Sequence, residues 1–240
     1  MRYVALGSSM AAGPGIPPRA RDSNFRAGRS ENNYPHLLAR RLGYDLVDVT
    51  YSGATTADLL EGKRAQVDAL DGSESLVTIT VGGNDVGYVP LLMAGSLPRL
   101  LRPRSLFDQG ERTAALDALP AKLTAVARAA RTRSPEARVV FVDYLTLLPP
   151  EGSPKGLSDD HVALGRRVAE GLARCTAQAA MAEGCELVRA SRASRDHHPW
   201  APIPWSNGPG LPIPGRPIPF HPNEVGMRAV AALLAEHLSG

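Results

Sequence analysis

Three segments that lie far apart in the chain carry residue types that together can attack a carbonyl group. Ser8 and Ser9 follow a short apolar run near the start of the chain. Asn84 and Asp85 follow another apolar run, and His221 comes just before the last helical pattern. A serine hydroxyl becomes a nucleophile when a base takes its proton, and histidine is the base that most often does so. Side-chain amides and backbone N–H groups can stabilise the charge that then develops on the carbonyl oxygen.

The elements that must bring these residues together follow an alternating pattern. We expect strands at residues 3–6, 45–49, 76–81, 138–143 and 186–188, and helices at 34–42, 56–70, 111–133, 158–183 and 223–238. Nearly continuous apolar strands are typical of a parallel sheet that helices cover on both faces. The alternation predicts an α/β fold, a three-layer α/β/α sandwich of flavodoxin-like type with a five-stranded parallel sheet. Ligands bind such sheets at the carboxyl ends of the strands.

Two segments, 86–109 and 196–222, show neither the apolar runs expected of buried strands nor the spacing of apolar residues expected of helices. The first contains three prolines, and the second is rich in proline. We expect both to be long loops that leave from strand ends and wall the site. The length of 240 residues allows one sizeable core, so residues 1–240 are predicted to form a single domain.

Composition and charge narrow the classes of partner. Hydrophobic residues make up 43% of the chain, and no apolar run reaches the roughly 20 residues that span a bilayer. The net charge of +3 comes from scattered arginines without interleaved aromatic residues, so nucleic acid is not expected as a partner. Because no charged leader or apolar signal core follows Met1, we expect a cytoplasmic protein.

Residue types that bind metals or form disulfides are few. Cys175 and Cys185 are expected to be thiols, with a disulfide between them as the alternative. Asp196, His197 and His198 are possible metal ligands, but adjacent residues on an irregular segment lack the spacing of a hydrolytic zinc site. We therefore expect no metal and no organic cofactor.

Four blocks of the chain resemble the motifs of the SGNH hydrolases, also called the GDSL esterase and lipase family. They are residues 7–10 (GSSM), Gly53, residues 82–85 (GGND) and residues 221–223 (HPN). They occur in the family's order, and the resemblance covers nearly the whole chain. Any one of these glycine turns or polar pairs is more often an ordinary turn or helix cap, so only their combination predicts catalysis.

The resemblance implies hydrolysis of a small carboxylic ester through an acyl-enzyme. Ser9 stands at the position of the family's nucleophile and His221 at that of its base, while Ser9 N–H, Gly53 and Asn84 would form the oxyanion hole. Asp85 is expected to order the turn that holds Asn84. Ser8 replaces the first-block aspartate and is expected to support the site in part of that residue's role, with Ser8 as the less favoured alternative nucleophile.

The third catalytic member departs from the family pattern, because Ile218 occupies the place of the aspartate in Asp-x-x-His. A backbone carbonyl in residues 216–219, such as that of Ile218, is expected to orient His221 in a Ser-His dyad. Asp196 is the rival candidate. This departure also keeps two other functions open: an acyltransferase that uses the same site, and a binding or regulatory protein that has lost efficient catalysis.

Overall fold

The computed structural model describes residues 1–62, 65–211, 213 and 217–240. Its strands form a five-stranded parallel sheet in the order β2-β1-β3-β4-β5. The strands are β1 (Arg2–Gly7), β2 (Asp45–Asp48), β3 (Glu74–Thr80), β4 (Arg138–Val142) and β5 (Glu186–Val188). The predicted α/β fold with a five-stranded parallel sheet is therefore confirmed.

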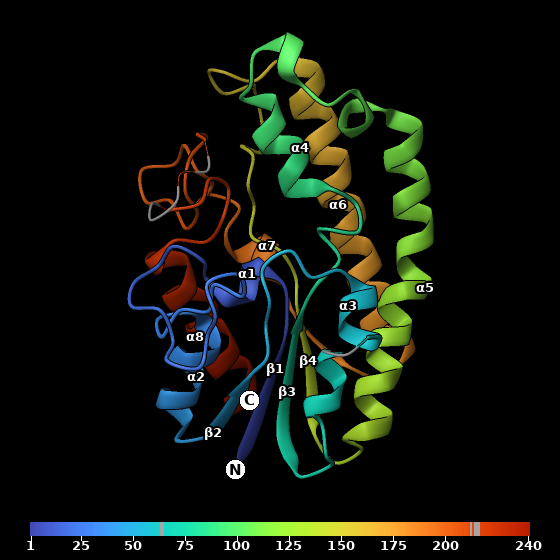
Figure 1. Cartoon of the computed structure of the whole chain (residues 1–240), viewed down its shortest axis with the longest axis vertical. Coiled ribbons are helices and arrows are strands. Elements are labelled where there is room, and N and C mark those ends of the chain that lie inside the picture. Colours follow the sequence, from blue (N-terminus) through green and yellow to red (C-terminus); the bar gives the residue numbers. More distant parts are fainter. Residues whose placement is uncertain (63–64, 212, 214–216) are drawn as a thin grey trace.

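Helices cover both faces of this sheet (Figure 1). On one face α2 (Tyr34–Leu42) packs against α8 (Glu224–Ser239), and on the other α5 (Gln109–Arg133) packs against α6 (Asp159–Ala182). The shorter helices are α1 (Ser9–Ala12), α3 (Thr56–Leu60), α4 (Tyr88–Gly95) and α7 (Ala190–Ala193), with 3-10 turns η1 (Gln66–Ala69), η2 (Arg99–Leu101) and η3 (Arg104–Phe107). The result is the predicted three-layer sandwich.

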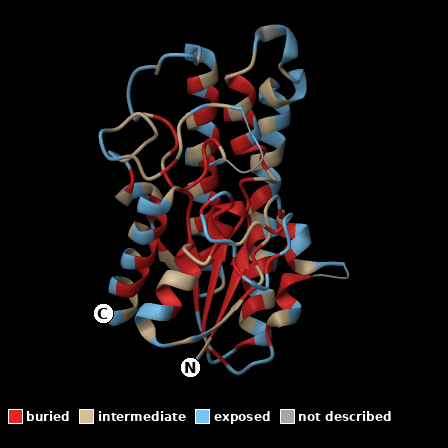
Figure 2. Cartoon of the chain, turned by 60° about the vertical axis from the view of Figure 1, so that its left-hand side comes forward, coloured by how far each residue is buried: buried red, intermediate tan, exposed pale blue. Residues whose placement is uncertain are grey.

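The three central strands β1, β3 and β4 are buried along most of their length, as Figure 2 shows for the centre of the molecule, whereas the edge strands β2 and β5 are mostly half-buried. In β1 the residues from Tyr3 to Leu6 are fully buried, and in β4 those from Val139 to Val142 are buried as well. Because helices remove both faces of each strand from water, alternate residues need not be polar. This explains why the strands appear in the sequence as continuous apolar runs.

The predicted helix at residues 56–70 is wrong in its length. α3 ends at Leu60, Glu61 is extended, and Gly62 has a φ of +90° that a helix cannot contain. The chain then makes the separate 3-10 turn η1. The helix thus ends where Glu61 adopts an extended conformation, ten residues before the predicted boundary, and Gly62 does not resume it.

The prediction that residues 86–109 form a loop is also wrong. This segment contains α4 and the two turns η2 and η3. Pro90 lies in the first turn of α4, where a missing N–H removes no helical hydrogen bond, and Leu91 and Leu92 are buried. The described part of residues 196–222 has no helix or strand beyond an isolated bridge between Ser206 and Pro222, as predicted for a loop.

The two cysteines are free thiols, so the alternative of a disulfide is wrong. Cys175 is buried on α6, and Cys185 precedes β5, where burial raises the pKa of its thiol to about 11. Among the residues described, no helix combines the length and apolar character needed to cross a bilayer.

Candidate active site

The turn after β1 holds Ser9 at the carboxyl edge of the sheet. Gly7 adopts a φ of +153°, and a Cβ there would lie 2.6 Å from the carbonyl oxygen of Thr80 at the end of β3. Only glycine permits this approach of the two strand ends. Gln66 of η1 fixes the same residue, because its Oε1 accepts from Gly7 N at 2.7 Å and its Nε2 donates to Gly7 O at 3.0 Å. α1 then starts at Ser9.

Ser9 and His221 are 212 positions apart in the chain and meet at this edge. Ser9 Oγ lies 2.9 Å from His221 Nε2, and each residue is 7% exposed. The carbonyl of Pro219 accepts a hydrogen bond from His221 Nδ1 at 2.9 Å. Since a carbonyl can only accept, Nδ1 carries the proton and Nε2 is free to accept the proton of the Ser9 hydroxyl.

Burial lowers the pKa of His221 below that of a free imidazole, while the Pro219 carbonyl opposes this shift. The desolvation of a buried imidazolium is the larger effect. The imidazole is therefore neutral at neutral pH, which is the form that can take a proton.

The histidine loop is held by Asn207. Asn207 N donates to His221 O at 2.8 Å, Phe220 N donates to Asn207 O at 3.1 Å, and Asn207 Nδ2 donates to Ile218 O at 3.0 Å. Phe220 is fully buried and has a φ of +56°, a conformation that is rare for a bulky residue. Three hydrogen bonds that involve Asn207 thus stabilise the strained backbone of Phe220, the residue directly before His221.

These contacts correct the expected orienter of His221. The Ile218 carbonyl is occupied by Asn207 Nδ2 and by the backbone N–H of His221, so it is the carbonyl of Pro219 that faces the ring. Residue 216 of the expected segment lies outside the described residues. Asp196 is exposed and makes no hydrogen bond to His221 within the described part of the chain; its charge acts on His198 instead.

Asn84 and Asp85 tie the turn after β3 to the turn after β2. Asn84 Nδ2 donates to Ala54 O at 2.8 Å. The Asp85 carboxylate accepts from Thr56 N at 3.0 Å and from Thr56 Oγ1 at 2.6 Å. These bonds fix Asn84 relative to Gly53, which has a φ of +86° and is exposed. Asn84 Nδ2 keeps a second hydrogen for another acceptor.

The backbone N–H groups of Ser9 and Gly53 at this edge have no acceptor within the residues described. Unused N–H groups beside a nucleophile are what a developing oxyanion requires. The residues expected to form the oxyanion hole therefore include two donors without a protein partner.

The Ser8 hydroxyl contacts Tyr144 and makes no hydrogen bond to His221 within the described residues. Ser8 is fully buried, and its Oγ lies 3.0 Å from Tyr144 Oη, which also accepts from Gly83 N at 3.0 Å. A Cβ at Gly83 would overlap the Tyr144 ring. Burial raises the pKa of Tyr144 to about 12, so its hydroxyl is neutral and can both donate and accept. Sequence reasoning missed Tyr144, whose one signal was its place directly after the predicted fourth strand.

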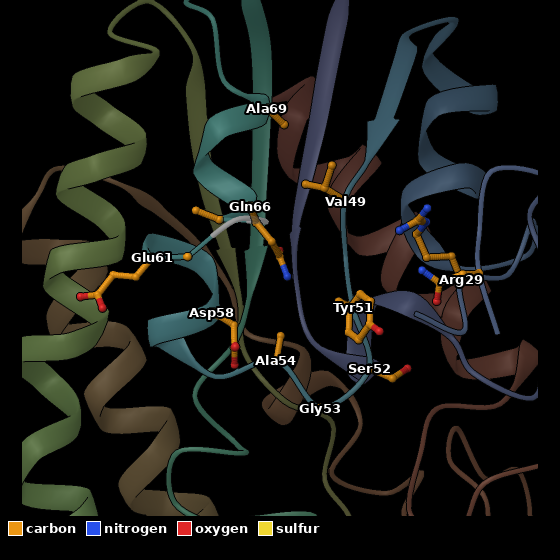
Figure 3. A pocket seen from close by; sticks show the side chains of 13 residues that line it. Arg29, Val49, Tyr51, Ser52, Gly53, Ala54, Asp58, Glu61, Gln66 and Ala69 are labelled. Atoms are coloured by element: carbon orange, nitrogen blue, oxygen red, sulfur yellow. The ribbon is translucent and has the colours of Figure 1, made fainter. Parts of the chain in front are cut away.

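A cavity of about 820 Å³ opens beside Gly53. Figure 3 shows its walls: Asp58 and Glu61 come from the side of α3, whereas Tyr51, Ser52 and Arg29 come from the other side. Gln66 lines it between these walls. Gly53 lines this cavity, which extends from there to η1, whereas Ser9, Asn84 and His221 are not among the described residues that line it.

The chain was compared with known proteins. The model of the GDSL-like lipase/acylhydrolase family matches residues 5–229. A lipase of Streptomyces coelicolor, named Lipase 2, is 32% identical over 95% of this chain and 83% of its own length. The crystal structure of an extracellular lipase from Streptomyces rimosus is 28% identical, with a TM-score of 0.85 over 98% of this chain and 99% of that one.

Another structural neighbour shows the fold alone. A phospholipase A1 from Streptomyces albidoflavus has a TM-score of 0.82 and 24% identity over 99% of this chain and 98% of its own. This neighbour therefore supports the α/β/α sandwich described above.

The fold and the four motif blocks define a hydrolase of the SGNH class. The chain belongs to the GDSL-like lipase/acylhydrolase family and is a carboxylic ester hydrolase. The cytoplasmic location expected from the sequence stays a prediction.

Proposed function

We propose that this protein hydrolyses carboxylic esters through an acyl-enzyme on Ser9, with His221 as the base. The observation that carries the proposal is the 2.9 Å distance between Ser9 Oγ and His221 Nε2, with Nδ1 engaged by the Pro219 carbonyl. A nucleophile, a base within hydrogen-bond reach and a group that orients the base are the parts that serine catalysis needs. Here the orienter is a carbonyl, so the catalytic unit is a Ser-His dyad.

The reaction runs in two steps. Ser9 Oγ attacks the ester carbonyl carbon while His221 Nε2 takes the hydroxyl proton, and the oxyanion accepts from Ser9 N, Gly53 N and Asn84 Nδ2. The tetrahedral intermediate collapses, and His221 gives its proton to the leaving alcohol oxygen. A water molecule then attacks the acyl-enzyme with His221 again as base, and the acid departs as Ser9 regains its proton.

Ser8, Tyr144 and Asp85 support this arrangement without touching the reacting atoms. Ser8 and Tyr144 link the nucleophile turn to Gly83, the residue before Asn84. Asp85 links the Asn84 turn to α3, next to Gly53. Preorganised donors stabilise a transition state because they need not move when charge develops.

The cavity beside Gly53 supports an ester whose acyl or alcohol part is larger than a few atoms. Its volume of about 820 Å³ lies within the usual range for small-molecule sites, and Val49, Ala54 and Ala65 give it apolar wall. The names of the lipase relatives favour an ester with an acyl chain as the substrate.

A fluorophosphonate probe together with a panel of p-nitrophenyl esters of increasing chain length tests the proposal. The probe should label the wild type and the S8A variant at Ser9, and should not label S9A. Ester turnover should follow the same pattern. Labelling of S9A would assign the nucleophile elsewhere, and absence of labelling and turnover in the wild type would indicate a binding protein. Added alcohols that divert the acyl group would indicate a transferase.

A further inference from the structure

A second cavity, of about 410 Å³, lies outside the proposed catalytic machinery. It is bounded by one face of α6, by α7 and by residues 144–150 after β4. Ser9, His221, Gly53 and Asn84 do not line it, whereas Tyr144 does. Most of its wall is apolar and comes from Leu145, Leu147, Leu148, Pro149, Pro150, Ala169 and Ala173.

Three arginines also line this cavity: Arg166 on α6, Arg192 on α7 and Arg195 just after α7. None of them lies within 4.0 Å of a carboxylate in the part of the chain that the structure describes. Glu170 is the acidic residue among the described residues that line the cavity, so the three arginines give the lining a net positive charge. A concave apolar surface with unpaired guanidinium groups attracts an anion.

Arg166 is held in position on the wall of the cavity. Its Nε and Nη2 donate to Pro149 O at 2.9 and 2.6 Å, and Nη2 also donates to Gly152 O. Carbonyl oxygens fix the orientation of the guanidinium without neutralising its charge. Its Nη1 has no hydrogen-bond partner among the described residues and remains available to an anion.

A buried hydroxyl adds a second, independent feature. Tyr88 of α4 lines the cavity and is 1% exposed. Its Oη lies beside the Leu147 backbone and makes no hydrogen bond of normal geometry within the described residues. Buried hydroxyls without a partner are uncommon in folded proteins, and a ligand or water bound in the cavity would satisfy this one.

We propose that this cavity binds a medium-chain carboxylate. The carboxylate pairs with Arg166 and with the exposed Arg192 and Arg195, and the alkyl chain covers the leucine and proline wall. Guanidinium groups match the geometry of a carboxylate, and burial of each CH₂ group is favourable. The choice of a carboxylate rests on the proposed ester hydrolysis, which releases one, whereas the charge and shape of the cavity do not depend on it.

Isothermal titration of the full chain with octanoate at low ionic strength tests this site. The experiment uses the S9A variant, so that no acyl-enzyme forms. Octanoate should bind saturably, and the R192Q/R195Q double variant should bind it about five-fold more weakly, because exposed charges have modest effects. E170Q should bind about two-fold more tightly, since it removes a like charge. Arg167 is exposed on the same helix but does not line the cavity, so R167Q should leave the affinity unchanged.

Titrations with acetate and with octyltrimethylammonium distinguish the contribution of the alkyl chain to binding from that of the carboxylate charge. Acetate lacks the chain and octyltrimethylammonium has the opposite charge, so both should bind much more weakly than octanoate. Absence of saturable octanoate binding would overturn the proposal. So would an octanoate affinity that is the same in R192Q/R195Q and E170Q as without these substitutions, or binding of octyltrimethylammonium as tight as that of octanoate. The fluorophosphonate experiment reports on Ser9 alone, so failure of the proposed function is seen separately.

Discussion

Replacement of Asp196 by alanine tests how His221 is oriented. Loss of a carboxylate that orients a catalytic histidine costs about 10⁴ in rate. In the structure, His221 Nδ1 is instead 2.9 Å from the Pro219 carbonyl, and Asp196 is exposed without a hydrogen bond to the ring among the described residues. An exposed substitution away from the ring changes free energies by about 0.5 kcal/mol or less, which is about two-fold in rate. We therefore expect D196A to keep kcat/KM within about two-fold of the wild type.

The assay is the hydrolysis of a p-nitrophenyl ester, with kcat and KM measured separately. D117A is a matched control, because Asp117 is an exposed aspartate on α5. H221A should reduce turnover to background and shows that the assay reports on the dyad. A loss of a thousand-fold or more in D196A, with D117A unchanged and the fold intact, would refute the dyad and assign Asp196 as the third member.

Four further predictions follow from the site. N84A should lower kcat by about 10² to 10³, as for other oxyanion donors, and a loss below ten-fold at saturating ester would assign the role to another group. Because burial lowers the pKa of His221, kcat/KM should fall at acid pH with an apparent pKa below about 6.5, and a midpoint above 7 in the pH profile would contradict this. Burial also raises the pKa of Asp143 to about 6, against the hydrogen bonds from Ser191. The stabilisation from protonated Asp143 is complete below about pH 4 and is lost as the pH rises to 6. The free energy of unfolding of the wild type, measured with denaturant, should therefore fall by about 2 kcal/mol relative to that of D143N over this range. The same pH dependence of the unfolding free energy in both proteins would contradict this. Y144F should lower the free energy of unfolding by about 1 to 3 kcal/mol, because Gly83 N loses its buried acceptor, and an unchanged midpoint would exclude this role.

Periodicity predicted the architecture because helices cover both faces of the sheet. Strands such as β1 and β4 are buried on both sides, so their apolar runs are visible in the sequence without knowledge of their neighbours. The errors lie where one residue decides the local structure. The extended Glu61 ends α3 early, and Pro90 occupies the first turn of a helix, where proline is tolerated.

The supporting residues of the site could not be predicted in the same way. Tyr144 and Ser8 meet across 136 positions, and Gln66 reaches Gly7 across 59. No local pattern marks either pair. Asn207 makes hydrogen bonds to three backbone groups of the histidine loop. These three bonds require the left-handed conformation of Phe220, which its residue type does not predict.

The sequence by itself determined the order of the five strands and the long helices, the family, and the four blocks whose residues form the edge of the site. Those properties depend on residue types and spacing, which periodicity and turn chemistry translate directly into strands, helices and turns. Only the tertiary structure decided that the Pro219 carbonyl accepts from His221, that Ser8 is buried against Tyr144, and that three arginines line a second cavity. Each of these depends on the path of an irregular segment or on contacts between distant elements, and packing of the whole chain determines both.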